Sequence, residues 1–245
     1  MSGPAKGTVY GVGLGPGDPD LMSVRADRLV RGSKHIAFFR KLGRKGRARA
    51  IVDGMLRTDA IEFAMEYPVT TEIPLTDPRY NEVLSAFYED CTRHLCALSS
   101  EGEDVVVLCE GDPFFYGSFM HLFTRLKPTC DVQVVPAITG MSAAWTASGA
   151  PITWGDDILS TVMGTLDEAA LTDAMTRADA LVVMKIGRNL PKVRRALAAA
   201  GKLDRAVLVE YASMEGQTVR PLSEFTKDTL PYFSIIVVHG QGRRP

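Results

Sequence analysis

Apolar segments of strand length alternate with segments of helical periodicity along most of the chain. The first half predicts strands at 7–14 and 34–40 and a helix at 18–30 that starts at Asp18. It also predicts a helix at 77–98 and a strand at 104–113 that runs into a tight turn. The segment 130–151 predicts a strand, a turn and a small-residue helix. The second half predicts four strands, at 157–164, 180–186, 205–212 and 232–240. Two helices, at 167–178 and 189–201, fall between them. This alternation is typical of α/β folds with a largely parallel sheet.

Composition excludes several classes of protein. The formal net charge of -1 gives no reason to expect binding to nucleic acid or to an anionic membrane, and no apolar run is long enough to span a bilayer. The start of the chain has no apolar signal segment, so we expect a cytoplasmic protein with reduced thiols at its four cysteines: Cys91, Cys96, Cys109 and Cys130. The four histidines show no ligand spacing to one another or to the cysteines, so no metal site is predicted.

A glycine-rich turn follows the first predicted strand, in the sequence VYGVGLGPGDPDLMSVRA over residues 9–26. It fails the dinucleotide pattern, because Pro16 or Asp18 stands where the third glycine belongs, and no lysine follows as in a nucleotide-triphosphate loop. Asp18 at the expected helix start would also repel a phosphate. The glycines could serve only a tight chain reversal, but a second GDP turn at 111–113 also follows an apolar strand. Both turns would lie at the carboxyl ends of parallel strands, where open α/β sheets bind ligands.

Five motifs in order resemble the tetrapyrrole (corrin and porphyrin) methyltransferases, which use S-adenosylmethionine: VGLGPGDPDLMSVRA at 12–26, EGDPFFYGS at 110–118, VVPAITGMSAA at 134–144, VVMKIG at 182–187 and VLVEYAS at 207–213. The resemblance implies two α/β domains, 1–138 with a mainly parallel sheet and 151–245 with a mixed sheet. The small-residue segment 139–150 would be the hinge. It also implies a cofactor in the cleft between the domains, S-adenosylhomocysteine as a product and a homodimer.

The same resemblance implies site residues by position. Residues expected to bind the cofactor are Pro16, Glu110, Gly111, Asp112, Phe115, Thr139, Gly140, Met184, Tyr211 and Ala212. Met184 would be an ordinary core residue without the family pattern. The family often has glycine where this chain has Glu110 and Ala137, so contacts there are expected to differ.

Within the family, GRARAIVDGML, EYPVTTEIP at 66–74 and the tyrosine of GDPFFYGS are most similar to the branch that methylates precorrin-2 at C20, giving precorrin-3A. The alternatives are a uroporphyrinogen-III or precorrin-4 methyltransferase, a diphthine synthase-like enzyme that methylates a protein side chain, or a non-catalytic binding module.

Two further hypotheses concern individual charges. Asp112 either assists the loss of the substrate proton or only caps the turn that follows it, and the cap is the favoured interpretation. The segment 40–49 carries six basic residues; Arg44, Lys45 and Arg47 would bind the carboxylates of a tetrapyrrole, unless the segment is a solvated loop. No nucleophile–base set is found, as expected for methyl transfer from a cofactor that carries the reactive group.

Overall fold

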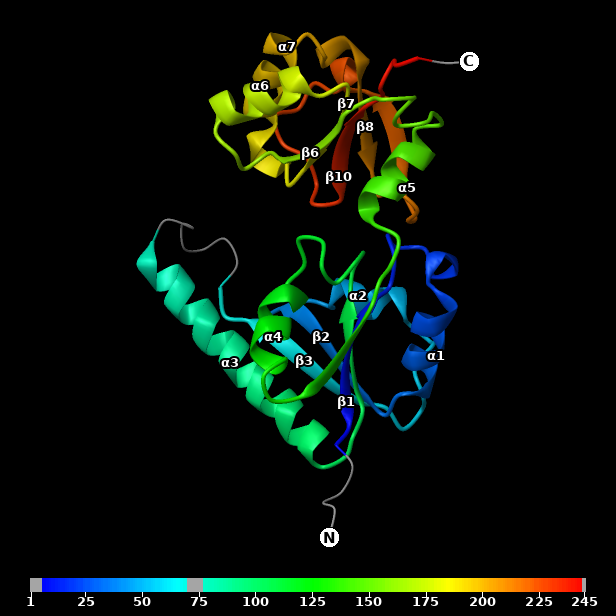
Figure 1. Ribbon diagram of the computed structural model, residues 1–245, viewed down its shortest axis with the longest axis vertical. Helices are drawn as coiled ribbons and strands as arrows, with labels where there is room; N and C mark the ends of the chain where they lie inside the picture. The colour runs from blue at the N-terminus through cyan, green and yellow to red at the C-terminus, as the bar shows by residue number, and fades with distance from the viewer. Residues whose placement is uncertain (1–5, 70–76, 244–245) are drawn as a thin grey trace. The chain divides into compact units, whose positions relative to one another are not determined.

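The computed structural model describes residues 6–69 and 77–243. The chain divides into two compact units, Met1–Thr139 and Gly140–Pro245, and Figure 1 shows their secondary structure. Most of the stretch 66–74, which contributed to the family resemblance, falls in residues 70–76 and so lies outside the described residues.

The first unit is built on a five-stranded sheet with the order β3-β2-β4-β1-β5. Its strands are β1 (Thr8–Gly13), β2 (His35–Lys41), β3 (Ile61–Tyr67), β4 (Val105–Cys109) and β5 (Asp131–Val135). All of the neighbouring pairs are parallel. Strand β1 lies between β4 and β5 and pairs Gly11 with Val107 on one side and with Val134 on the other, so the ends of β1, β4 and β5 reach the same edge.

Helices cover both faces of this sheet. They are α1 (Val24–Gly32), α2 (Arg47–Ile51), α3 (Pro78–Ser100) and α4 (Phe119–Leu126). Leu95 of α3 and Phe119 of α4 pack with Val107 on one face, whereas Val30 of α1 packs with Val106 on the other. Adjacent residues of β4 therefore enter opposite cores, because successive side chains of a strand point to opposite faces.

The start of α1 differs from the prediction. Asp18 does cap a helical turn, since its side chain accepts a hydrogen bond from the backbone N–H of Asp20, but this turn is the short 3-10 helix η1 (Pro19–Leu21). The α-helix begins at Val24, where the Ser23 hydroxyl accepts from the backbone N–H of Ala26. Two capping residues within six positions split the predicted helix into two elements.

The second unit contains a five-stranded mixed sheet with the order β6-β7-β10-β8-β9. Its strands are β6 (Leu159–Met163), β7 (Ala180–Met184), β8 (Ala206–Glu210), β9 (Thr218–Pro221) and β10 (Ser234–Val238). Only β6 and β7 pair in parallel; β10 runs antiparallel to both β7 and β8. The prediction of two α/β domains, the first with a parallel and the second with a mixed sheet, is confirmed.

The helical elements of the second unit are α5 (Gly140–Ala147), α6 (Glu168–Arg177), η2 (Gly187–Asn189), α7 (Leu190–Ala199), η3 (Leu203–Arg205) and η4 (Leu222–Glu224). Leu171 of α6 and Val193 of α7 pack in a core with Leu208. A separate cluster joins Ala144 of α5 to Val237. Residues 140–147 of the expected hinge thus form a helix whose small side chains pack on the second sheet.

Several elements were not anticipated from the sequence: α2, β3, α4 and β9. The expectation of four free thiols is also wrong. The structure joins Cys96, in α3, to Cys130, just before β5, and leaves Cys91 and Cys109 free and buried. Residues 34 positions apart come together here because α3 and α4 pack on the same face of the sheet.

Two kinds of feature are absent from the described part of the chain. No helix in it has the length and apolarity that crossing a membrane requires. Nor do its histidine, cysteine, aspartate and glutamate side chains gather into a group of three or more that could hold a metal ion.

Candidate functional site

The loops that follow β1, β4 and β5 meet at the carboxyl edge of the first sheet, as the two GDP turns led us to expect. Gly13, the last residue of β1, lies at the point where these loops cross. A Cβ atom on Gly13 would stand 2.6 Å from Cβ of Ala137, 2.8 Å from the carbonyl oxygen of Gly111 and 2.9 Å from Cδ of Pro113. The turn at 111–113 and the loop at Ala137 therefore both pack against a position where only glycine fits.

Backbone pairing joins the two glycine turns directly. Gly15 and Gly111 form an isolated antiparallel bridge, in which the backbone N–H of Gly111 donates to the carbonyl oxygen of Gly15 at 2.8 Å. Both residues have positive φ, 83° for Gly15 and 61° for Gly111. A Cβ atom on Gly111 would meet nothing within 4 Å, so this backbone is open to an approaching ligand. Pro16, which follows Gly15, is buried.

The carboxylate of Asp112 ties the turn after β4 to the loop after β5. One of its oxygens accepts from the backbone N–H of Phe114 at 2.9 Å, and the other accepts from the backbone N–H of Ala137 at 3.0 Å. Both oxygens thus hold backbone in place. The predicted capping role of Asp112 is therefore present, together with a second, long-range bond that the sequence did not indicate.

Glu110 occupies a different environment from Asp112, although only Gly111 separates them. Its side chain is partly buried, and within the described residues it makes no hydrogen bond or ion pair. Burial raises the pKa of Glu110 to about 7, while the positive charge of Arg47 acts in the opposite direction. Burial, followed by the negative charges of Asp112 and Glu110, also raises the pKa of the Cys109 thiol.

The basic segment 40–49 is not a continuous loop. It begins in β2 and ends in α2. Ion pairs with other described residues hold Arg40 to Glu66, Lys45 to Asp53, and Arg49 to Asp53 and Glu62. Arg44 and Arg47 are exposed, and the side chain of Arg44 forms no ion pair within the described residues. Arg47 is the first residue of α2 and acts electrostatically on Glu110.

Aromatic and hydroxyl side chains surround the end of the GDPFFYGS motif. Phe115 is partly buried and stacks edge-on against Tyr116, with 4.8 Å between ring centroids. Tyr67, at the end of β3, donates a hydrogen bond to the hydroxyl of Ser118. Burial raises the pKa of Tyr88, against hydrogen bonds to Ser118 and Tyr67. No sequence pattern indicated this hydroxyl cluster, because its members come from β3, α3 and the motif.

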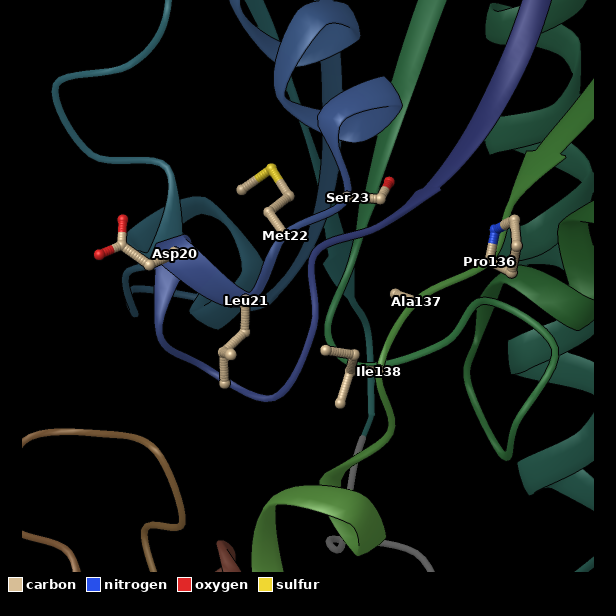
Figure 2. A pocket seen from close by; sticks show the side chains of 7 residues that line it. All are labelled: Asp20, Leu21, Met22, Ser23, Pro136, Ala137 and Ile138. Carbon is tan, nitrogen blue, oxygen red and sulfur yellow. The ribbon is translucent and has the colours of Figure 1, made fainter. Parts of the chain in front are cut away.

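A hollow of about 480 Å³ lies beside these loops, between η1 and the segment after β5. Its lining residues are Asp20, Leu21, Met22, Ser23, Pro136, Ala137 and Ile138. In Figure 2 the side chains of Leu21 and Ile138 extend in the same direction from the two segments. None of the residues predicted to bind the cofactor lines this hollow, although Thr139 directly follows it in sequence. The hydrophobic pattern could not identify the hollow, since its two sides come from two distant loops.

Within the second unit, four predicted residues gather at one edge of the sheet. Met184 ends β7, Tyr211 follows β8, and these two strands run in the same direction on either side of β10. Met184 and Ala212 pack against the cluster of Ala144 and Val237 beneath α5. Gly140 starts α5, and a Cβ atom there would lie 3.5 Å from Cδ1 of Ile235. Met184 is thus both a core residue and part of this edge.

Tyr211 has a backbone conformation that is uncommon for a residue with a side chain. Its φ is 55°, and Lys185, after Met184, has a φ of 51°. The backbone N–H of Tyr211 donates to the carbonyl oxygen of Phe233 at 2.8 Å, which holds the turn after β8 against the entry to β10. Strained turns at two parallel strand ends are typical of functional sites.

Each of the two groups of residues, taken by itself, suits a ligand that approaches backbone rather than one held by charges. The first group offers the open Gly111 backbone and the Asp112 tie; the second offers Gly140 and the turn at Tyr211. Among the described residues, neither group contains a nucleophile beside a base. In each group, the residues present are therefore compatible with a cofactor that carries its own reactive group.

A parallel α/β unit with interlocked glycine turns, followed by a mixed α/β unit, is the arrangement of a tetrapyrrole methylase, and the chain belongs to that family. The model of the Tetrapyrrole (Corrin/Porphyrin) Methylases matches residues 8–226. The chain is 46% identical to the precorrin-2 C(20)-methyltransferase of a Sinorhizobium species, with 100% of both chains covered. It is 30% identical to the cobalt-precorrin-2 C(20)-methyltransferase of Salmonella typhimurium, over 96% of this chain and 97% of the relative.

A solved structure agrees on the fold. The uroporphyrin-III C-methyltransferase of Thermus thermophilus, crystallised with S-adenosylhomocysteine, superposes with a TM-score of 0.65 at 24% identity, over 95% of this chain and 97% of that chain. The family model and the two relatives confirm the family resemblance inferred from the five motifs.

Proposed function

We propose that this protein transfers a methyl group from S-adenosylmethionine to C20 of precorrin-2, giving precorrin-3A and S-adenosylhomocysteine. The observation that carries the proposal is the 46% identity to a precorrin-2 C(20)-methyltransferase over the full length of both chains. The lower identity, 30%, to a relative named for the cobalt-containing substrate favours the metal-free macrocycle.

S-adenosylmethionine, when bound, supplies an activated methyl group on a sulfonium sulfur. The chain must bind it, align it with the substrate carbon and exclude water. We assign the methionine end to the backbone at 110–112 with Phe115 nearby, and the adenosine side to Met184, Tyr211 and Ala212. Pro16, Thr139 and Gly140 complete this set. The open backbone of Gly111 and the fixed turn at Tyr211 support these assignments.

The carboxylates of the macrocycle need cationic partners. We assign this role to Arg44, Lys45 and Arg47, the exposed cations from the loop after β2 to the first residue of α2. Arg44 is the strongest of the three, because Lys45 is bound to Asp53 at 2.7 Å and Arg47 already interacts with Glu110. An exposed ion pair contributes little and can exchange for a substrate carboxylate.

The deciding experiment is incubation with precorrin-2 and S-adenosylmethionine labelled with ¹³C in the methyl group, followed by NMR of the macrocycle. Label at C20 is the expected result. Label at another carbon would place the protein in another branch of the family. Parallel reactions with cobalt-precorrin-2 and uroporphyrinogen-III compare the alternative tetrapyrroles, and absence of transfer to any of them would favour a protein substrate or a binding module.

We further propose that the enzyme is a cytoplasmic homodimer. The membership of the family supports both statements. Light scattering of the purified protein at micromolar concentration gives the mass in solution, and cell fractionation gives the compartment. A monomeric mass or recovery outside the cytoplasm would contradict the respective statement.

A further inference from the structure

We propose that the side-chain carboxylate of Glu110 accepts the proton that leaves C20 when this carbon is methylated. The proposal rests on the function proposed above and deepens it by naming a catalytic residue. Glu110 takes the place of Asp112 as the candidate for this task. Three features support Glu110 over Asp112: the contacts of the two carboxylates, their positions at the strand end and the charges around them.

The position of Glu110 follows from the directions of the side chains along β4, which alternate between the two faces of the sheet. Val107 and Cys109 point into the core under α3 and α4, whereas Val106 and Leu108 point into the core under α1 and α2. Glu110 is next in this alternation and therefore lies on the α1 and α2 face. This is the side from which Arg47, at the start of α2, acts on it.

Asp112 is held by other contacts. Its two oxygens accept hydrogen bonds from the backbone N–H groups of Phe114 and Ala137, so the carboxylate fixes two loops. Moving it to take up a substrate proton would break one of these bonds. Glu110 has no such bond within the described residues, so its carboxylate can accept a proton without releasing any part of the fold.

Burial, opposed by one nearby positive charge, brings the pKa of Glu110 close to neutral pH. Burial raises its pKa to about 7, and Arg47 limits the rise. On its own segment, the charge of Glu110 acts on the Cys109 thiol, and the charge of Asp112 acts there as well. A base that titrates near the working pH is ionised often enough to accept a proton and weak enough to release it afterwards.

The reaction at C20 conserves atoms and electrons. An electron pair of the macrocycle at C20 forms the new bond to the methyl carbon, and the sulfur–methyl bond breaks with its electrons remaining on sulfur. The C20–H bond then breaks: its electrons return to the macrocycle and its proton passes to the Glu110 carboxylate. The resulting carboxylic acid releases the proton to water before the next turnover.

The test uses the full chain and compares Glu110→Gln with the wild type at saturating precorrin-2 and S-adenosylmethionine. The substitution keeps the size of the side chain and removes the base, so kcat should fall about 100-fold or more. Binding of S-adenosylhomocysteine, measured by calorimetry, should not change. The wild-type rate should fall as the pH drops through about 7, which is the pKa of Glu110, and this acid limb should be absent in the variant.

Glu66→Gln is the matched control. Glu66 lies near the carboxyl end of β3 in the same sheet, two strands from β4, but its carboxylate is bound to Arg40 at 2.6 Å, so its loss should leave kcat and the acid limb in place. A readout independent of turnover is the ¹³C NMR signal of labelled glutamate carboxyls. The signal that disappears in Glu110→Gln should titrate in the wild type with a midpoint near 7. A midpoint below about 5, the range of an ordinary glutamate, would overturn the proposal.

The outcomes separate the two proposals. If the wild type labels C20 and Glu110→Gln turns over at the same rate, the role of Glu110 is wrong and the function stands. If the wild type does not methylate C20, the proposed function falls and the role of Glu110 falls with it. If Glu110→Gln no longer binds S-adenosylhomocysteine, Glu110→Asp decides: a retained acid limb supports the proposal, and turnover independent of pH overturns it.

Discussion

The carboxylate of Asp112 accepts a hydrogen bond from the backbone N–H of Ala137, 25 residues further along the chain. This bond connects the loop after β4 to the loop after β5, while Gly111 is bonded to Gly15 after β1. The edge of the first sheet is therefore a network of backbone bonds with Asp112 at its centre. The geometry of the site depends on this network.

Asp112→Asn tests whether Asp112 positions loops or moves protons. An asparagine retains one acceptor oxygen but turns an N–H₂ group toward one of two backbone donors. We expect a loss of about 1–3 kcal/mol of stability, weaker binding of S-adenosylhomocysteine, and nearly normal kcat at saturating cofactor. Thermal unfolding, calorimetry and steady-state kinetics measure the three effects. A large fall in kcat with unchanged stability and affinity would restore the catalytic role.

Gly13→Ala tests the crossing point of the three loops. The new Cβ atom would lie within 3 Å of Ala137, Gly111 and Pro113, and two of these three contacts involve backbone or a rigid ring. We expect destabilisation of about 1–3 kcal/mol together with loss of cofactor binding. Gly32→Ala is the control, because a Cβ atom there meets nothing within 4 Å and the residue ends α1. An unchanged melting temperature in Gly13→Ala would show that the loops separate easily.

Neutralising the basic segment tests its role in substrate binding. We expect Arg44→Gln, Lys45→Gln and Arg47→Gln together to raise KM for precorrin-2 and to leave the affinity for S-adenosylhomocysteine unchanged. Arg57→Gln is a control cation outside the segment, paired with Asp59 at 2.7 Å. Unchanged KM in the triple variant would show that the segment is a solvated surface.

Arg47→Gln alone predicts a further effect. The positive charge of Arg47 lowers the pKa of Glu110 against the effect of burial. Its removal should therefore move the acid limb of the pH–rate profile to higher pH, whereas Arg44→Gln should leave the limb where it is. Equal midpoints of the acid limb in the two variants would contradict the electrostatic interaction between Arg47 of α2 and Glu110 after β4.

Glu110→Gln should also change stability in a pH-dependent way that does not involve turnover. The pKa of Glu110 rises from 4.5 to about 7 on folding, so the folded protein holds a proton that the unfolded chain releases. Stability contributed by this group therefore falls as the pH rises from about 4.5 to 7, and the loss is complete above 7. Glutamine has no carboxylate to titrate, so the variant does not lose stability in this way. The variant should be more stable than the wild type at pH 8, on the order of 1–3 kcal/mol after allowance for partial exposure.

Melting curves of wild type and Glu110→Gln between pH 4 and pH 8 measure this difference. The two curves should converge at the acid end and separate steadily through neutrality. Separation at the acid end instead would mean that the fold stabilises the Glu110 carboxylate in its charged form, and would contradict the desolvation of this side chain.

The sequence alone determined the class of fold and the family. Alternation of apolar strands and amphipathic helices requires sheets covered by helices. Pro16, Asp18 and the missing lysine exclude the glycine patterns that bind nucleotide phosphates, and the second GDP turn predicts a ligand site at the strand ends. The order of the five motifs then indicated the family. These features are local, since each depends on residues that are neighbours in the chain.

Only the tertiary structure decided how the site residues differ from one another. Glu110 and Asp112 belong to one motif, yet Asp112 binds Ala137 of another loop, while Glu110 is partly buried near Arg47 of α2. The pairing of Cys96 with Cys130 and the bond from Tyr67 to Ser118 likewise join distant segments. Burial, charge and hydrogen bonding between distant segments depend on packing of the whole unit, and no local pattern in the chain records them.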